Sequence, residues 1–425
     1  MRAPIPPRVK PAIRVRLTVE ASGSPVRSTR SLVRSSMTRH PWTDRPRVRL
    51  PVHKNLTGPF HSSERSAAHD GLMRIAVIAS IAHACPPRAY GPWELIAWLL
   101  AEGLTSRGHD VTLFATANSS TTARLGARVA EGYEESDRID ARVATTLHVA
   151  HAMEQAGEFD VICNHFDFHA LAFARMTATP MVTTVHGFSS EKIVEVYREY
   201  DAETHYVSIS EANRHPDVTY AATIHHGIPV SEVPVGSGSG GYLIAVGRVH
   251  PDKGTHAAID VARATGLPLF IAGTVHDHDY YREWVAPHVD GVSVHFLGNL
   301  DAARRDHLVG GAAALVHPIG FDEPFGLAVV ESLAVGTPVI AFDRGSMPEL
   351  IDPGRTGFLV GDVDQAVDAV REVHALDRRV CRHEAERRFS VDRMVDDYER
   401  LFQDVIDRSV MRATAHPSRT TDPLR

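Results

Sequence analysis

The sequence is poor in the residues that mark several classes of protein. Three cysteines, Cys85, Cys163 and Cys381, occur among 425 residues. They are too few and too scattered for a disulfide framework or a thiolate zinc site, so we expect a reducing, cytoplasmic environment. Apolar runs fall far short of the roughly 18 residues of a transmembrane helix. With 43% hydrophobic residues the chain is neither collagenous nor wholly disordered, and its length suits two or three domains with their own cores.

Basic residues are scarce outside the first part of the chain. The net charge of −7 disfavours nucleic acid as a partner. Residues 1–72 hold 14 Lys and Arg against 4 Asp and Glu, whereas residues 73–425 hold 31 against 48. The first segment is rich in Arg, Pro and Ser and has no sustained apolar period, so we expect a disordered basic extension. A transit peptide is the alternative, although the prolines disfavour the amphipathic helix of such a peptide.

From residue 73 the pattern becomes that of an α/β domain. Short apolar runs alternate with helical stretches, of which residues 93–106 are the clearest. The runs lie at residues 74–79, 111–114, 159–163, 181–185, 206–209 and 222–225. Continuous apolar strands between helices predict a parallel sheet covered on both faces. We therefore predict an N-terminal Rossmann-like domain over residues 73–228.

A linker rich in Pro, Gly and Ser, residues 229–241, precedes a second series of the same kind. We expect a second Rossmann-like domain over residues 242–392, with strands near residues 243–246, 268–272, 292–296, 313–317 and 338–342. Apolar residues at helical spacing predict a final helix over residues 393–408, followed by a flexible tail over residues 409–425. Two doubly wound domains place a ligand cleft between the carboxyl ends of their sheets.

The first candidate site motif follows a predicted strand and opens a predicted helix. Gly247 and Gly254 allow close approach to the backbone, and Arg248 and Lys253 supply mobile positive charge. Such cations at a helix N-terminus suit a diphosphate. The spacing is not that of a P-loop, and no G-x-G-x-x-G follows the first strand, which weakens a dinucleotide interpretation. The plainer interpretation is a surface loop with solvated charges.

The second candidate motif surrounds a short predicted helix. Phe325, Gly326 and Leu327 begin this helix, and their N–H groups form an anion site. Glu331, on the helix, can accept hydrogen bonds from vicinal hydroxyls such as a ribose diol, and Glu323, before it, can bind sugar hydroxyls. Glu331 could instead be a solvated helix residue, but its apolar surroundings make an isolated glutamate costly unless a ligand pairs with it.

With these motifs the chain resembles glycosyltransferase family 4, whose members are retaining enzymes with two Rossmann-like domains in the GT-B fold. The resemblance covers residues 73–406. The matching segments are a glycine-rich loop at residues 86–94, a histidine motif at 184–187, the phosphate-binding motif at 247–254, a strand end at 296–298 and the signature at 323–338. The chain departs from the family where Pro92 follows Gly91, since the family often has two glycines there.

The resemblance implies a role for each candidate residue. Donor binding is implied for Gly91, Arg248, Lys253, Phe325, Gly326, Leu327 and Glu331, and catalysis for His186 and Glu323. Arg248 and Lys253 would hold the donor diphosphate and Glu331 the ribose. Glu323 would bind the hydroxyls of the donor hexose, with His186 beside the transferred sugar. The final helix would cross back onto the N-terminal domain.

The implied activity is that of a retaining hexosyltransferase. It would move a hexose from a UDP-, GDP- or ADP-linked donor to a hydroxyl of a sugar, a lipid or a small metabolite, with no metal or other cofactor. No nucleic acid or transmembrane segment is expected, while peripheral membrane contact stays open. Rival interpretations are a nucleotide-sugar epimerase or glycosyl phosphorylase on the same fold, and a non-catalytic nucleotide-sugar binding protein.

Other residues leave two interpretations open. His165 and His169 have the spacing of metal ligands on a helix, but no cysteine or carboxylate cluster supports a metal site, and His165 could instead face the acceptor. Tyr90 and Trp93 could stack on an acceptor or simply pack in the core. His226 is expected to pack beside the hinge between the domains.

Overall fold

The structure is a computed structural model that describes residues 71–88, 90–188 and 190–415, all within one compact unit. The expected basic extension therefore lies outside the described residues, apart from Gly71 and Leu72. Among the described residues, no helix combines the length and apolarity needed to cross a membrane.

The first sheet has seven parallel strands in the order β3-β2-β1-β4-β5-β6-β7. Successive residues of β1 enter different cores, Ile75 and Val77 on one face of the sheet and Ala76 and Ile78 on the other. The elements are β1 Arg74–Ile78, α1 Pro92–Ser106, β2 Asp110–Ala115, β3 Arg124–Ala127, α2 Ala141–Met153, β4 Val161–Asn164, β5 Met181–Val185, α3 Val194–Glu199, β6 Thr204–Ser208 and β7 Tyr220–Thr223.

The second sheet has six parallel strands in the order β10-β9-β8-β11-β12-β13. Its central strand alternates in the same way, because Leu243 and Ala245 enter one core and Ile244 the other. The elements are β8 Leu243–Val246, α4 Thr255–Thr265, β9 Leu269–Ala272, α5 His278–Tyr280, β10 Val294–Gly298, α6 Ala302–Gly311, β11 Ala314–His317, α7 Leu327–Ala334, β12 Val339–Phe342, α8 Met347–Leu350, β13 Gly357–Val360, α9 Val363–Glu372, α10 Arg378–Phe389 and α11 Val391–Ala415.

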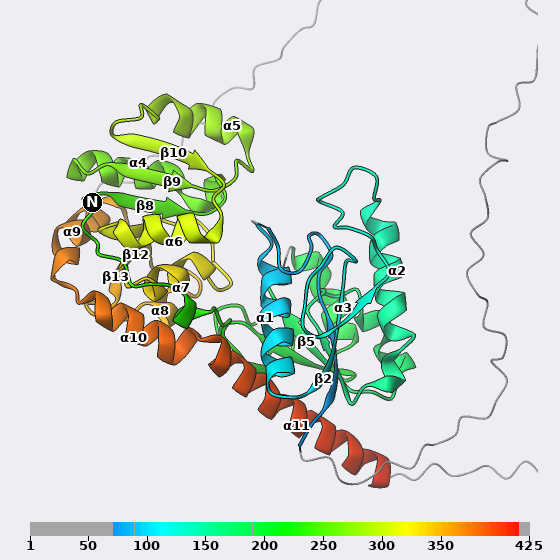
Figure 1. The fold of residues 1–425 in the computed structure, drawn as a ribbon. Helices are drawn as coiled ribbons and strands as arrows, with labels where there is room; N and C mark the ends of the chain where they lie inside the picture. Colours follow the sequence, from blue (N-terminus) through cyan, green and yellow to red (C-terminus); the bar gives the residue numbers. More distant parts are fainter. Residues whose placement is uncertain (1–70, 89, 189, 416–425) are drawn as a thin grey trace, which may run out of the picture. The chain divides into compact units, whose positions relative to one another are not determined.

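Both sheets place their first strand centrally, with the next strands on one side and the later strands on the other. The predicted α/β architecture with two doubly wound, Rossmann-like parallel sheets is confirmed. In such sheets the strand order reverses beside the first strand, which opens a crevice at the carboxyl ends. The loops after β1, β8 and β11 begin at these crevices and contain most of the predicted site residues (Figure 1).

Two helices join the domains. α10 packs against α7 in the second domain, and α11 packs against α1 in the first, as the orange and red ribbons of Figure 1 show. The hydroxyl groups of Tyr398 in α11 and Thr184 in β5 are 2.7 Å apart. Gly103 of α1 allows this packing, because an added Cβ would lie 2.5 Å from Val395. α11 extends to Ala415, whereas the sequence predicts a flexible tail from residue 409.

The edge strands depart most from the sequence expectations. β3 and β13 are not among the predicted strands, and β7 begins at Tyr220 rather than near residue 222. Three residues of β3 are only half-buried and the first is exposed. An edge strand of this kind needs no continuous apolar run, so its sequence resembles that of a loop.

Candidate functional site

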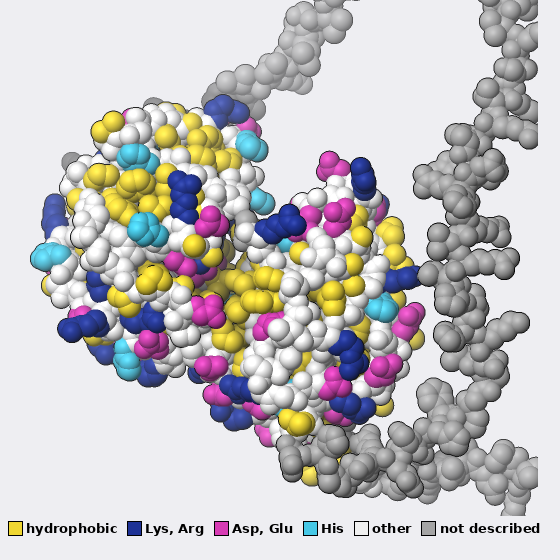
Figure 2. Space-filling model, viewed as in Figure 1, with side chains coloured by type: hydrophobic (Ala, Val, Ile, Leu, Met, Phe, Trp, Pro, Cys, Tyr) yellow, Lys and Arg dark blue, Asp and Glu magenta, His cyan; other side chains and the backbone are white. Residues whose placement is uncertain are grey.

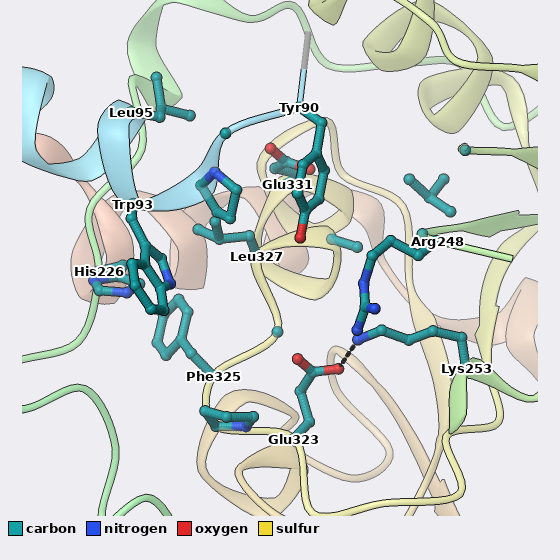
Figure 3. Close-up of a pocket in the computed structure, with 18 of the residues that line it drawn as sticks. Tyr90, Trp93, Leu95, His226, Arg248, Lys253, Glu323, Phe325, Leu327 and Glu331 are labelled. Atoms are coloured by element: carbon teal, nitrogen blue, oxygen red, sulfur yellow. Dashed lines mark hydrogen bonds and ion pairs between the residues drawn. The ribbon is translucent and has the colours of Figure 1, made fainter. Parts of the chain in front are cut away.

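A pocket of about 440 Å³ lies at the carboxyl ends of both sheets. Figure 2 shows the surface hollowed between the two domains, and Figure 3 shows the lining side chains. The structure brings all nine candidate residues to this pocket: Gly91, His186, Arg248, Lys253, Glu323, Phe325, Gly326, Leu327 and Glu331. Gly273 and Asn299, from the loops after β9 and β10, also line it.

The loop after β8 is shaped by glycine. Gly254 has φ +65°, and a Cβ at this position would lie 1.9 Å from the carbonyl oxygen of Pro318. This residue also ends the short 3-10 turn Pro251–Lys253 and precedes α4. Only glycine fits both the backbone conformation and the close approach. The loop thereby directs Arg248 and Lys253 into the pocket (Figure 3).

Lys253 pairs directly with a carboxylate in the structure. Its ammonium group forms an ion pair with Glu323 and lies 4.7 Å from the centre of the Phe321 ring. The resemblance implies that Lys253 binds the diphosphate and Glu323 the sugar, and it gives no sign that the two side chains meet. Burial raises the pKa of Glu323, but nearby His317 and Lys253 outweigh burial and lower it to about 2. Glu323 is therefore ionised throughout the neutral range.

α7 begins without a side-chain cap. Gly326 has φ +97° and precedes Leu327, and no side chain accepts a hydrogen bond from the first turn. Just before this turn, the oxygen of Phe325 accepts a hydrogen bond of 2.5 Å from the Ser346 hydroxyl. Uncapped N–H groups and the helix dipole leave a partial positive charge at this edge of the pocket.

Glu331 has a protein partner that the sequence analysis misses. Its carboxylate lies 2.7 Å from a guanidinium nitrogen of Arg305, which also pairs with Asp306 at 2.8 Å. Burial raises the pKa of Glu331, and the positive charge of Arg305 opposes this rise. The expectation that Glu331 is an isolated glutamate requiring a ligand is thus wrong. Arg305 lies on a polar helix, α6, where its sequence gives no signal that distinguishes it from the neighbouring Arg304.

His186 is the middle member of a chain of three buried imidazoles. Its Nε2 lies 3.0 Å from Nδ1 of His165, and its Nδ1 lies 3.3 Å from Nε2 of His226. Burial lowers the pKa of each of the three residues, so all are neutral near pH 7. Trp93 stacks on His186 with ring centres 5.4 Å apart. Both ring nitrogens of His186 are therefore occupied by other histidines.

This row of imidazoles changes two earlier expectations. His165 lies behind His186 rather than facing an acceptor. His226 lines the pocket instead of only packing beside the hinge. Among the described residues, no three His, Cys, Asp or Glu side chains form a group suited to a metal ion, and His169 packs against Phe166 and Phe168.

The loop after β1 brings aromatic side chains to the pocket. Tyr90 is 50% exposed, and both Tyr90 and Trp93 line the cavity beside Gly91. The buried carboxylate of Glu94 holds this region, because it accepts hydrogen bonds from the Ser80 hydroxyl at 2.7 Å and from the Ala82 N–H at 3.1 Å. Trp93 both packs on His186 and faces the cavity, so the two interpretations offered for it are compatible (Figure 3).

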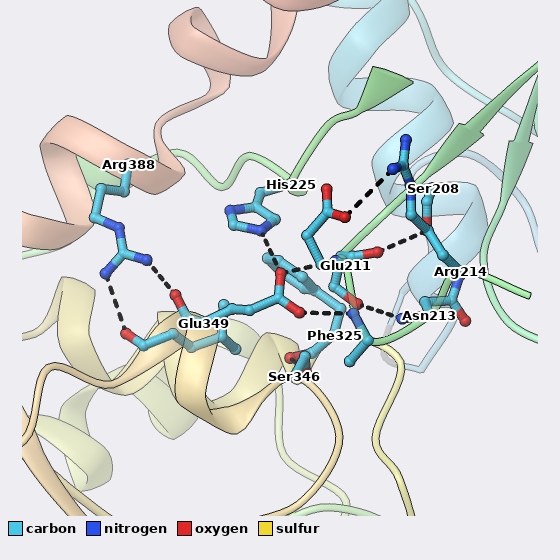
Figure 4. A network of polar contacts seen from close by, with 12 residues as sticks. Ser208, Glu211, Asn213, Arg214, His225, Phe325, Ser346, Glu349 and Arg388 are labelled. Carbon is cyan, nitrogen blue, oxygen red and sulfur yellow. Dashed lines mark hydrogen bonds and ion pairs between the residues drawn. The ribbon is translucent and has the colours of Figure 1, made fainter. Parts of the chain in front are cut away.

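The domains also contact each other beside the pocket. The Glu349 carboxylate of α8 accepts hydrogen bonds from the backbone N–H groups of Glu211 and Ala212, at 2.8 and 2.7 Å (Figure 4). His225 Nε2 lies 3.2 Å from the same carboxylate. Burial raises the pKa of Glu349, but His225 and these N–H groups lower it on balance. These contacts fix the loop after β6 relative to α8.

Two family models and a curated relative match the sequence of this chain. The model for glycosyl transferases group 1 matches residues 237–388, and that for glycosyltransferase family 4 matches residues 94–231. Glycogen synthase of Mycobacterium tuberculosis is 27% identical over 346 residues, which cover 68% of this chain and 83% of that protein.

Two solved structures share the fold. HepE from Anabaena, in complex with UDP and glucose, has a TM-score of 0.60 at 18% identity and covers 78% of this chain and 99% of its own. Sucrose-phosphate synthase from Thermosynechococcus elongatus has a TM-score of 0.64 at 17% identity, with 79% and 99% covered. These two structures show that the chain has the GT-B fold. The two family matches, which together span more than half of the 425 residues, and the similarity to glycogen synthase support a glycosyltransferase of the family 4 type.

Proposed function

We propose that the protein transfers a hexose from a nucleoside diphosphate sugar to an acceptor hydroxyl with retention of the anomeric configuration. The observation that carries the proposal is one pocket in which Arg248 and Lys253 face Glu323 and Glu331. Cations and an uncapped helix N-terminus suit the diphosphate, while carboxylates suit the hydroxyls of the ribose and the hexose. The complex of HepE with UDP and glucose supports a donor of this class.

The donor would be held by groups from the second domain. Arg248, Lys253 and the N-terminus of α7 surround the position proposed for the diphosphate. Glu331, paired with Arg305, would accept hydrogen bonds from the two ribose hydroxyls. Glu323 has a second oxygen with which to bind the hexose while Lys253 bridges to the phosphate. When the donor binds, Lys253 would therefore contact both Glu323 and the phosphate, and Glu323 would contact both Lys253 and the hexose.

In the proposed reaction the bond between the anomeric carbon and the phosphate oxygen breaks. The acceptor oxygen forms its new bond to the same face of that carbon, and the acceptor proton passes to the departing phosphate oxygen. Arg248 and Lys253 would stabilise the negative charge that develops on the phosphate, as preorganised cations do. His186 is neutral and both its ring nitrogens are engaged, so we assign it the placement of the transferred sugar rather than proton transfer.

Nucleotide binding tests the donor proposal first. A thermal-shift panel with UDP, GDP and ADP is expected to show stabilisation by at least one of them, and no stabilisation by any would contradict the proposal. The corresponding glucose donors then report turnover, which we expect to survive EDTA because protein cations supply the phosphate contacts. The configuration of the product, determined by NMR, tests retention.

The rival activities leave different products. An epimerase would convert its nucleotide sugar without an acceptor, and a phosphorylase would require inorganic phosphate. A non-catalytic binding protein would bind the nucleotide with no turnover in the presence of any acceptor. The intact set of Arg248, Lys253, Glu323 and Glu331 favours catalysis.

A further inference from the structure

The two walls of the pocket differ sharply in charge. Every charged lining residue comes from the second domain: Arg248, Lys253, Arg305, Glu323 and Glu331. The described lining of the first domain is uncharged: Tyr90, Gly91, Pro92, Trp93, Leu95, His186, Gly187, Phe188, Ile209 and His226. Burial lowers the pKa of both histidines in this wall, so they add no positive charge near neutral pH.

The cations of the described pocket wall already have carboxylate partners. Arg305 pairs with Glu331 at 2.7 Å, Arg248 lies 3.5 Å from Asp252, and Lys253 pairs with Glu323. A bound donor diphosphate adds further negative charge to this arrangement. A second anionic ligand would then enter a partly desolvated, negatively charged space with no free cation on the described wall, which is strongly unfavourable.

We propose that the part of the acceptor entering this pocket is uncharged and presents a flat or ring-shaped apolar face, as a neutral sugar or glycoside does. This inference rests on the proposed donor function of the second domain. The exposed Tyr90 ring and the Trp93 ring provide the surfaces on which such a face would stack (Figure 3). Acceptors whose reacting unit carries a phosphate or a carboxylate are disfavoured by charge.

A competition between matched acceptors tests the inference. Glucose and glucose 6-phosphate, glycerol and glycerol 3-phosphate, and a neutral aryl glucoside are offered together with the preferred nucleotide sugar, and the products are identified by mass. We expect the neutral member of a pair to be used at least about tenfold more efficiently than its phosphorylated partner. Equal or preferred use of the phosphorylated members overturns the inference, as does a lack of any neutral product.

The competition separates this inference from the donor proposal. If a nucleoside diphosphate stabilises the protein while phosphorylated acceptors are preferred, the donor proposal stands and only the acceptor inference fails. If no nucleotide binds, the donor proposal itself fails.

Variants of Tyr90 probe the acceptor wall directly, because this side chain is half exposed and can change without disturbing the core. Tyr90→Ala is expected to raise the acceptor KM about tenfold, equivalent to about 1.4 kcal/mol, with unchanged affinity for the nucleotide. Tyr90→Phe keeps the ring and should retain a near-normal KM. Trp284→Ala serves as the control, since Trp284 is also exposed but lies outside the pocket lining.

Tyr90→Lys supplies the cation that the first-domain wall lacks. We expect it to raise the use of glucose 6-phosphate relative to glucose by about tenfold, with the gain lost at high salt. An unchanged ratio in this variant would show that charge does not select the acceptor.

Discussion

The ion pair between Arg305 and Glu331 offers the sharpest test of how this site is built. Arg305→Met keeps most of the apolar stem but removes the charge that lies 2.7 Å from Glu331. The side chains are 26% and 14% exposed, so water screens the pair only partly. Removing one partner of a buried pair costs about 3–5 kcal/mol, and partial exposure of Arg305 lowers our expectation to about 2–3 kcal/mol.

The protonation of Glu331 decides whether the stability lost in Arg305→Met grows or shrinks as the pH rises. Burial already raises the pKa of this carboxyl, and loss of Arg305 raises it further. A carboxyl whose pKa is higher in the folded than in the unfolded state favours folding when protonated and opposes it when ionised. The stability difference between wild type and Arg305→Met is therefore expected to be small in acid and to grow as the pH rises to neutral.

Nucleotide binding provides a second measurement of the effect of Arg305→Met. Without the charge of Arg305, Glu331 binds a proton more readily, and a protonated carboxyl is a poorer acceptor for two ribose hydroxyls. Arg305→Met should therefore weaken nucleotide binding about tenfold to a hundredfold where Glu331 is protonated, and this loss should begin at a higher pH than in the wild type. In the wild type the same loss should occur only as the pH falls through the raised pKa of Glu331. Calorimetric titration with the nucleotide at several pH values measures both effects.

A double-mutant cycle isolates the pair. Urea unfolding of wild type, Arg305→Met, Glu331→Gln and the double variant is expected to give a coupling energy of about 2 kcal/mol. Arg304→Met is the control, because the neighbouring Arg304 side chain is exposed. Additive effects within about 0.5 kcal/mol, together with unchanged nucleotide affinity in Arg305→Met, would refute the assignment of Arg305 as the charge partner of Glu331.

Three further changes test other parts of the molecule. Lys253→Ala removes a cation from the proposed diphosphate site and should lower turnover by orders of magnitude, measured as nucleotide release from the donor. Gly254→Ala should unfold at markedly lower urea than Gly266→Ala: both have positive φ, but only at Gly254 would the new Cβ meet the oxygen of Pro318, at 1.9 Å. Deleting residues 1–72 should leave transferase activity intact, because the described pocket lining begins at Tyr90, and a large loss would show that the extension contributes to catalysis.

The central strands and the site motifs could be predicted because their signals are local. β1, β8 and β12 contain continuous apolar runs, as is typical of strands buried on both faces. The motif around Gly254 depends on a backbone conformation that glycine alone adopts readily, so the residue itself marks the turn. The edge strand β3 carried no such signal, because half-buried residues are not required to be apolar.

The partners of the site residues could not be predicted. His165, His186 and His226 follow three different strands of the first sheet, and only the parallel arrangement of those strands brings their rings together. Arg305 reaches Glu331 from a different helix, and either neighbouring arginine on α6 fits the sequence equally well. Contacts between residues far apart in the chain depend on strand order, which residue spacing along the sequence does not encode.

The sequence by itself determined the chemistry available to this protein: two α/β domains, a cationic glycine loop and two carboxylates eight residues apart. Periodicity and glycine placement are properties of neighbouring residues, so they can be read without the fold. The tertiary structure alone decided how those charges are paired and which wall of the pocket carries no charged side chain. Two opposite charges compensate each other only when they lie within a few ångströms. Only the packing of the two sheets fixes those distances.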